Sequence, residues 1–239
     1  MCAHIVRSYD AELSALDDLV AEMGGLAERL LSDAIEVLDR RDPRLATTAA
    51  ASDSAIDVLE RQIQERAITM IAKRQPMADD LRHIMTVLKI ASDIERVGDL
   101  AKNIAKRAGA IAEESFPRTL MNGLRHMGQE ALLQLKEVQD AFARRDVEAA
   151  MQVWRKDARL DELYNSVFRE LLTYMMEDPR NISLCTHLLF AAKNIERIGD
   201  HATNIAENLH YLIRGVLPGP ERPKSDDTSS ILIGRPKTE

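Results

Sequence analysis

The sequence predicts an all-α protein built from two tandem three-helix bundles that are related by internal duplication, with a pseudo-twofold relation between them. Three observations lead to this fold class. Apolar residues recur at helical spacing through six long segments. Aromatic residues make up only 4% of the 239 residues, and strand-like alternation of any length is absent. Finally, a stretch near the middle of the chain is repeated near its end.

The first half of the chain is expected to form helices over residues 8–40, 43–74 and 77–113. The first segment carries apolar residues at alternating spacings of three and four from end to end. The second opens with Asp42–Pro43, which suits a helix N-cap followed by proline in the first turn. The third follows Pro76, because proline disrupts a helix interior.

The second half is expected to repeat this pattern with helices over residues 118–144, 146–178 and 180–215. The fifth helix opens with Asp146, which follows an arginine pair as Asp42 does in the first half. The sixth follows the junction Asp178–Pro179, a second N-cap and proline pair. Because short connections make neighbouring helices antiparallel, each half is expected to form one elongated bundle.

These elements divide the chain into three parts. Residues 1–114 and 115–216 are expected to form the two bundles, joined by a linker that contains Pro117. Residues 217–239 are rich in proline and serine and lack periodicity, so a disordered tail is expected there.

Composition excludes several classes of protein. The net charge is -7 and stacking aromatics are few, which argues against a general nucleic-acid binder. The two cysteines, Cys2 and Cys185, form no CxxC motif and suggest neither a disulfide framework nor a zinc finger. No apolar run approaches the ~20 residues of a membrane span, and the N-terminus turns acidic too early for a signal peptide. A cytoplasmic location is expected.

The repeated stretch carries most of the functional information. Residues 91–107 (ASDIERVGDLAKNIAKR) match residues 192–208 (AKNIERIGDHATNIAEN) at an offset of 101. Upstream, two further acidic residues are repeated at an offset of 104. The repeated polar residues and glycines are Glu95 with Glu196, Arg96 with Arg197, Gly98 with Gly199, Asp99 with Asp200, Asn103 with Asn204, Asp53 with Asp157, and Asp57 with Asp161.

Eight of these residues form four acidic pairs with i,i+4 spacing, so each pair shares one helix face. If the first hairpin folds about Pro76, then Asp57 and Glu95 lie level, 19 residues from it on either side. Asp53 and Asp99 lie level too, 23 residues from it. The spacing sets the level and leaves the rotation of the helices open. The second hairpin gives the corresponding pairs, Asp161 with Glu196 and Asp157 with Asp200.

Four converging carboxylates repel one another unless they are protonated or bridged by cations. Hard oxygen ligands suit Mg, Ca, Mn or Fe, and carboxylates can bridge several ions. In a chain with 39 acidic residues, a single acidic pair is usually a solvated surface. Four pairs, duplicated and in matched register, favour two metal sites.

The other repeated residues leave alternatives open. Gly98 and Gly199 either allow close helix packing or leave room for a ligand. The two repeated arginines either pair with the acids, which is the expected role, or bind an anion. The two asparagines are oxygen ligands, or support the ligands by hydrogen bonds, or are simply polar. A di-iron site of the ferritin type needs two Glu-x-x-His motifs, and this chain has one, formed by Glu207 and His210. In the first half Lys106 replaces the glutamate, so the histidines do not complete such a site.

The sequence resembles the PhoU family, the regulators of the phosphate-specific transport system, over about residues 5–215. The resemblance rests on the RSYDAELSALDDLVAEMGGLAERLLSDAIEVLDRRD opening and on the IERVGDLAKNIA and IERIGDHATNIA segments. It implies two three-helix bundles and metal clusters bound through doubled E(D)xxxD motifs, with divalent or trivalent ions such as Fe, Mn, Mg or Zn. The implied ligands are Asp53, Asp57, Glu95 and Asp99 in the first site, and Asp157, Asp161, Glu196 and Asp200 in the second.

The resemblance also implies a function. Such a protein is a non-enzymatic, cytoplasmic negative regulator of phosphate uptake and phosphate-regulon signalling. It is a homodimeric adaptor between the ATPase subunit of the phosphate ABC transporter and the phosphate sensor histidine kinase. Two other classes remain open: a carboxylate-bridged metalloenzyme, which the missing histidine ligands argue against, and a structural helical scaffold with solvated acidic faces. No P-loop, GxGxxG or GxSxG motif is present.

Overall fold

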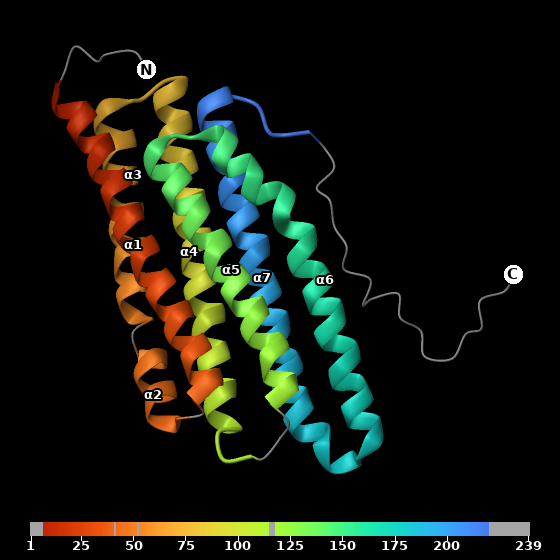
Figure 1. Cartoon of the computed structure of the whole chain (residues 1–239). Coiled ribbons are helices and arrows are strands. Elements are labelled where there is room, and N and C mark those ends of the chain that lie inside the picture. The colour runs from red at the N-terminus through yellow and green to blue at the C-terminus, as the bar shows by residue number, and fades with distance from the viewer. Residues whose placement is uncertain (1–6, 41, 52, 115–117, 220–239) are drawn as a thin grey trace, which may run out of the picture.

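The computed structural model describes residues 7–40, 42–51, 53–114 and 118–219. Within these ranges all regular elements are helices, and most of them run along one long axis (Figure 1). The linker at residues 115–117 and most of the expected disordered tail lie outside the described residues. The helices are α1 (Arg7–Arg40), α2 (Pro43–Ala51), α3 (Ser54–Arg74), α4 (Asp79–Ala110), α5 (Arg118–Arg144), α6 (Val147–Glu177), the 3₁₀ turn η1 (Pro179–Asn181) and α7 (Ile182–Arg214).

Three aspartates cap helices as the sequence predicted. The backbone N–H of Arg44 donates to Asp42 Oδ1 at 2.8 Å at the start of α2. Asp146 Oδ1 accepts from the N–H of Ala149 at 3.0 Å at the start of α6. Asp178 Oδ1 accepts from the N–H of Arg180 at 2.9 Å and opens η1 ahead of α7. Each bond satisfies one backbone donor that a helix N-terminus otherwise leaves unpaired.

The structure divides the second expected helix into two. α2 ends at Ala51, and α3 begins at Ser54, whose Oγ donates to the carbonyl of Ala51 at 3.4 Å. Small polar side chains that bond to nearby backbone compete with helix formation, and Ser54 makes such a bond here. As a result Asp53 lies at the start of a helix, whereas its counterpart Asp157 lies inside the continuous helix α6.

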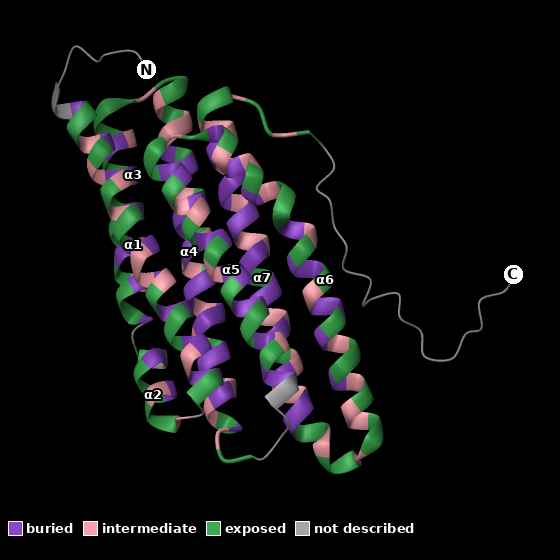
Figure 2. Ribbon diagram, in the orientation of Figure 1, coloured by how far each residue is buried: buried purple, intermediate pink, exposed green. Residues whose placement is uncertain are grey.

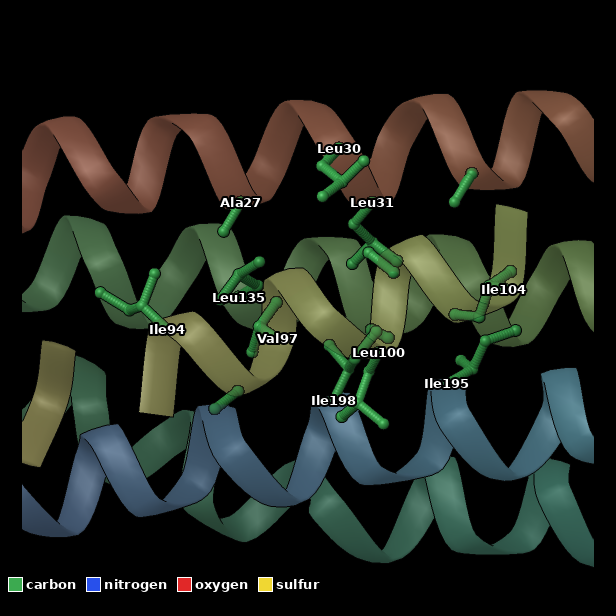
Figure 3. Close-up of a cluster of buried hydrophobic side chains, with 14 of the residues drawn as sticks. Ala27, Leu30, Leu31, Ile94, Val97, Leu100, Ile104, Leu135, Ile195 and Ile198 are labelled. Atoms are coloured by element: carbon green, nitrogen blue, oxygen red, sulfur yellow. The ribbon is translucent and has the colours of Figure 1, made fainter. Parts of the chain in front are cut away.

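The two halves share one hydrophobic core. α4 packs along α7, while α1 packs on α4, α5 packs on α7, and α1 also contacts α5. Leu31, Val97, Leu135 and Ile198 come from these four helices and meet in the cluster shown in Figure 3. Burial of each such side chain stabilises the fold by about 1.5–3 kcal/mol. The buried stripes in Figure 2 face this shared interior, so the two bundles form one continuous body.

The contacts between α4 and α7 locate the pseudo-twofold axis. Asp93, five residues before Gly98, meets Asn204, five residues after Gly199. The guanidinium of Arg107, nine residues after Gly98, lies 4.3 Å from the ring centroid of Phe190, nine residues before Gly199. In each contact the two residues are equally far along their antiparallel helices from Gly98 and from Gly199. The two repeated glycines are therefore level, and the axis that relates the halves passes between them.

Candidate functional site

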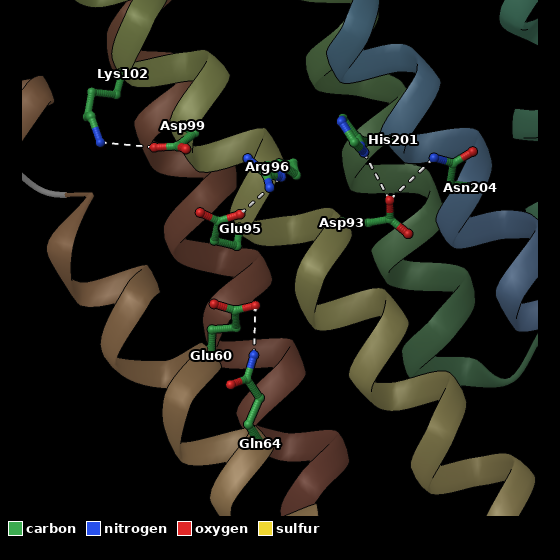
Figure 4. A network of polar contacts seen from close by, with 9 residues as sticks. All are labelled: Glu60, Gln64, Asp93, Glu95, Arg96, Asp99, Lys102, His201 and Asn204. Carbon is green, nitrogen blue, oxygen red and sulfur yellow. Dashed lines mark hydrogen bonds and ion pairs between the residues drawn. The ribbon is translucent and has the colours of Figure 1, made fainter.

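The first acidic cluster consists of Asp53, Asp57, Glu95 and Asp99, and it lies where the start of α3 meets α4. Lys102 Nζ donates to Asp99 Oδ1 at 3.0 Å and also to Asp53 Oδ2. Figure 4 shows the bond to Asp99. One lysine can reach both carboxylates only because Asp53 and Asp99 are level, which confirms this part of the predicted register. Its bond to Asp53, followed by its bond to Asp99, raises the pKa of Lys102 against the effect of burial.

Glu95 is influenced by acidic residues on both helices. Burial is the largest cause that raises the pKa of this carboxyl, and the charge of Asp99 adds to it. Arg96, whose Nε lies 3.6 Å from Glu95 Oε2, opposes the shift, while the charges of Glu60 and Asp57 raise the pKa further. Asp57 is thus close enough to Glu95 to act on its ionisation.

Glu60 is an acidic neighbour of the first cluster that the sequence pattern did not single out (Figure 4). It has no acidic partner four residues away, since Ile56 and Gln64 occupy those positions. Its spacing of three residues from Asp57 is the signal that places it on the same side of α3. The same i,i+3 spacing joins Lys102 to Asp99 and Lys193 to Glu196, two pairings that the sequence pattern also missed.

The second acidic cluster consists of Asp157 and Asp161 on α6 and of Glu196 and Asp200 on α7. It is more deeply buried than the first, because Asp157, Asp161 and Glu196 are only 2%, 4% and 6% exposed. Lys193 Nζ donates to Glu196 Oε1 at 2.8 Å and lies 4.9 Å from the ring centroid of Tyr164. This cluster has no counterpart of Lys102, since Thr203 stands at that position and donates to the backbone of Asp200.

Glu196 senses its neighbours on both helices. Burial raises the pKa of its carboxyl, the hydrogen bond from Lys193 opposes this, and the charges of Asp200 and Asp161 raise the pKa further. The charge of Asp161 on α6 thus acts on Glu196 on α7, the residue predicted to lie at the same level. Glu196 Oε2 is buried, and it finds no hydrogen-bond partner in the part of the chain that the structure describes.

The two repeated glycines allow close packing at both clusters. A β-carbon on Gly98 would lie 2.8 Å from Ile56 Cδ1 and 3.3 Å from Asp53 Oδ1. A β-carbon on Gly199 would lie 2.4 Å from Leu160 Cδ2. Of the two alternatives that the sequence left open, the structure supports close helix packing, which brings α3 and α6 against the glycine positions of α4 and α7.

The repeated asparagine of the second half belongs to a different network. Asp93 Oδ1 accepts from Asn204 Nδ2 at 3.3 Å and lies 2.9 Å from His201 Nδ1 (Figure 4). Asn208 Nδ2 donates to the other oxygen of Asp93 at 3.4 Å. These bonds join the halves across the α4–α7 contact. Asn204 is therefore turned toward α4, and His201, which has no counterpart in the first half, takes part in joining the two bundles.

The donor atoms of both clusters fit a hard cation, since all eight side chains offer carboxylate oxygens and one oxygen of Glu196 is buried without a partner. Within the described ranges, however, no three histidine, cysteine or acidic side chains are arranged to share one metal ion. The predicted level of Asp53 with Asp99 is confirmed by Lys102, and the rotation that would make the carboxylates converge is the quantity that spacing left open. The metal-ligand role of the eight carboxylates stays a prediction.

Among the described helices, none combines the length and the apolar character that a bilayer crossing requires.

Comparison with known proteins places the duplicated architecture in a family. The family model named "PhoU domain" matches residues 20–108 and again residues 124–209, once in each half. A "Phosphate-specific transport system accessory protein PhoU homolog" from Rhizobium meliloti (strain 1021) is 55% identical over 229 residues, which cover 96% of this chain and 97% of that protein.

Two solved structures are also similar. The crystal structure of PhoU from Pseudomonas aeruginosa has a TM-score of 0.84 and 41% identity, and the match covers 87% of this chain and 100% of that one. The crystal structure of the phosphate transport system regulatory protein PhoU from Streptococcus pneumoniae has a TM-score of 0.82 and 28% identity, with coverage of 89% and 100%.

Proposed function

This chain belongs to the PhoU family, and we propose on that basis that it regulates phosphate transport. The observation that carries the proposal is the match of the family model to both halves, together with close relatives that cover almost the whole chain. Those relatives are named as accessory proteins of the phosphate-specific transport system. The proposed role is negative: the protein restrains phosphate uptake and phosphate-regulon signalling when phosphate is plentiful.

The regulator is proposed to act as an adaptor and not as an enzyme. Its partners would be the ATPase subunit of the phosphate ABC transporter and the phosphate sensor histidine kinase, and it would work in the cytoplasm as a homodimer. The long, continuous helical body supports this role, because it offers extended surfaces on both sides of the pseudo-twofold axis.

The two acidic clusters are proposed to bind metal ions of the Fe, Mn, Mg or Zn type. When bound, an ion would supply positive charge that neutralises the buried carboxylates. In the second cluster the ion would be held by carboxylate oxygens from two helices. Asp157 and Asp161 would supply them from α6, and Glu196 and Asp200 from α7. Support comes from the buried, unpartnered Oε2 of Glu196 and from the matched levels of the two acidic pairs.

Deletion and complementation test the regulatory role. In a strain without this gene, phosphate uptake and phosphate-regulon expression are expected to stay high in phosphate-rich medium, and the full chain is expected to restore repression. Unchanged expression after deletion would refute the proposed regulation.

Elemental analysis of protein purified without chelator or tag-bound metal tests the metal role separately. Metal is expected in the natural protein and is expected to be lost from a folded Asp99→Ala/Asp200→Ala double variant. Absence of metal from both proteins would leave the clusters as acidic faces and would not affect the regulatory proposal.

A further inference from the structure

Gln134 is the most unusual polar residue in the core. It lies on α5 and is 0% exposed, and neither its Oε1 nor its Nε2 has a hydrogen-bond partner among the described residues. A buried polar group without a hydrogen-bond partner destabilises the folded state. An apolar residue would avoid that cost, so the amide calls for a ligand that the helices themselves do not provide.

The position of Gln134 supplies a candidate for that ligand. Its Oε1 lies 3.3 Å from the point where a β-carbon of Gly199 would stand, and Asp157 Oδ1 lies 3.7 Å from the same point. The two oxygens are thus at most about 7 Å apart, within reach of one cation that binds one directly and the other through a water. Side chains of α5 and α6 meet at this point against the backbone of α7.

The first half has no such donor. At the offset of 104 that relates the first helices of the two halves, Leu30 of α1 corresponds to Gln134 of α5. Leu30 packs in the shared core, as Figure 3 shows. A second position differs between the halves in the opposite direction. Lys102 places a positive charge in the first cluster, whereas Thr203, the matching residue of the second half, is uncharged. In the first cluster Lys102 lies between two of the carboxylates, whereas in the second Lys193 bonds to Glu196 and Gln134 adds a neutral oxygen donor nearby.

We propose that Gln134 is an additional ligand of the second acidic cluster, from outside the repeated motif. Its Oε1 binds, directly or through one water, the hard divalent cation that Asp157, Asp161, Glu196 and Asp200 hold. The second cluster is therefore the tighter of the two metal sites. This inference rests on the metal-binding role proposed above.

The test is a titration of the full-length, metal-free protein with Mn²⁺, in which free Mn²⁺ is followed by electron paramagnetic resonance. The natural protein is expected to show one tight and one weaker class of site. Gln134→Leu, which installs the residue of the first half, is expected to weaken the tight class on the order of tenfold. The metal-free variant is expected to unfold at a higher urea concentration than the natural protein, because an unpaired amide has been removed from the core.

Two further variants sharpen the test. Gln134→Glu keeps an oxygen donor and is expected to bind Mn²⁺ at least as tightly as the natural protein. Gln139→Leu removes another α5 glutamine, one that donates to the carbonyl of Gly24, and is expected to leave Mn²⁺ affinity unchanged. Circular dichroism verifies that each variant is folded, and Gln134→Met replaces Gln134→Leu if the leucine does not fit.

The failures of the two proposals are distinguishable. If the natural protein binds no Mn²⁺, the metal role fails and the role of Gln134 fails with it. If the natural protein binds Mn²⁺ and Glu196→Gln weakens the tight class, but Gln134→Leu and Gln134→Met bind as tightly as the natural protein, then only the role of Gln134 is overturned.

Discussion

The two acidic clusters occupy equivalent places in a duplicated fold, yet their surroundings differ. In the first, Asp53 stands at a helix break and shares Lys102 with Asp99. In the second, Asp157 lies within a continuous helix, three of the four carboxylates are almost fully buried, and Lys193, which bonds to Glu196, is 39% exposed. The repeat has kept the acids and changed what balances their charge.

This difference shows how duplicated sites can diverge without losing their ligands. An internal ammonium stabilises the first cluster without metal and competes with any ion that approaches it. Deeper burial in the second cluster raises the cost of unbalanced charge, so that site gains more from an external cation. The comparison is thus between a cluster in which one lysine bridges two carboxylates and a more deeply buried cluster in which a lysine bonds to Glu196.

The largest effect is expected from removal of the internal cation. Lys102→Met keeps the aliphatic stem but leaves the buried Asp53 carboxylate without its lysine, so the metal-free protein is expected to lose about 2–3 kcal/mol in free energy of unfolding. Lys193→Met is the matched control in the second half. Lys193 is more exposed than Lys102, although its partner Glu196 is as buried as Asp53, so its loss is expected to cost less, about 1–2 kcal/mol. Urea unfolding measures both, and equal losses would contradict the contrast between the clusters.

A smaller effect is expected from the repeated glycines. Alanine raises helix propensity by about 1 kcal/mol, whereas overpacking a core costs about 1–3 kcal/mol. Gly199→Ala is expected to lower the free energy of unfolding by about 1–2 kcal/mol, because its β-carbon would lie 2.4 Å from Leu160 Cδ2. Gly98→Ala is expected to cost less, since the nearest atom, Ile56 Cδ1, is 2.8 Å away. A stabilised Gly199→Ala protein would show that the second bundle is loosely packed there.

Much of this fold follows from local rules in the sequence. The caps at Asp42, Asp146 and Asp178 and the level of Asp53 with Asp99 were predictable, because they depend on residue spacing and on short-range hydrogen bonds. The break at Asp53 was not predicted, because it depends on a competition between local serine bonds and helix continuity.

The parts of the site that escaped prediction depend on helix rotation and on contacts between distant segments. Gln134 reads as one polar residue in an amphipathic helix, and only the packing of α5 against α7 brings it to Gly199. His201 lacked a counterpart in the repeat and therefore attracted no role, although it binds Asp93 across the halves. Spacing along one helix cannot give the rotation about its axis relative to another.

The α4–α7 contact offers a further test of asymmetry. His201→Leu installs the residue that the first repeat has at this position, Leu100. It removes the 2.9 Å contact with Asp93 and is expected to cost about 1 kcal/mol, because Asp93 keeps its bonds to Asn204 and Asn208. The midpoint of urea unfolding at pH 8 measures the loss. His126→Leu, on the exposed face of α5, serves as the control, and equal midpoints for the two variants would mean that the contact does not stabilise the joined halves.

The smallest expected effect separates the clusters by their pH dependence. Burial raises the pKa of both Glu95 and Glu196 above the ordinary glutamate value, with repulsion from neighbouring acids adding to it. A raised folded-state pKa means that the folded protein binds more protons than the unfolded chain between the two pKa values. Stability therefore falls as pH rises through that window, from the ordinary glutamate range upward, and the loss is complete once the folded carboxyl has ionised.

Replacement of either glutamate by glutamine removes the part of the pH-dependent loss of stability that this glutamate causes. Glu196→Gln is expected to flatten the dependence of metal-free unfolding on pH more than Glu95→Gln does, because Glu196 is the more deeply buried of the two. Urea midpoints measured from pH 4 to pH 8 give the two slopes. In the metal-free protein at neutral pH, Glu196→Gln is expected to raise the urea midpoint more than Glu95→Gln does. Addition of Mn²⁺ is expected to reverse this order, because the bound ion stabilises the charged form of Glu196. If the urea midpoint of Glu95→Gln depended less on pH than that of Glu196→Gln, then the first cluster would be the one in which burial raises the glutamate pKa more. That result would contradict the contrast drawn between the two clusters.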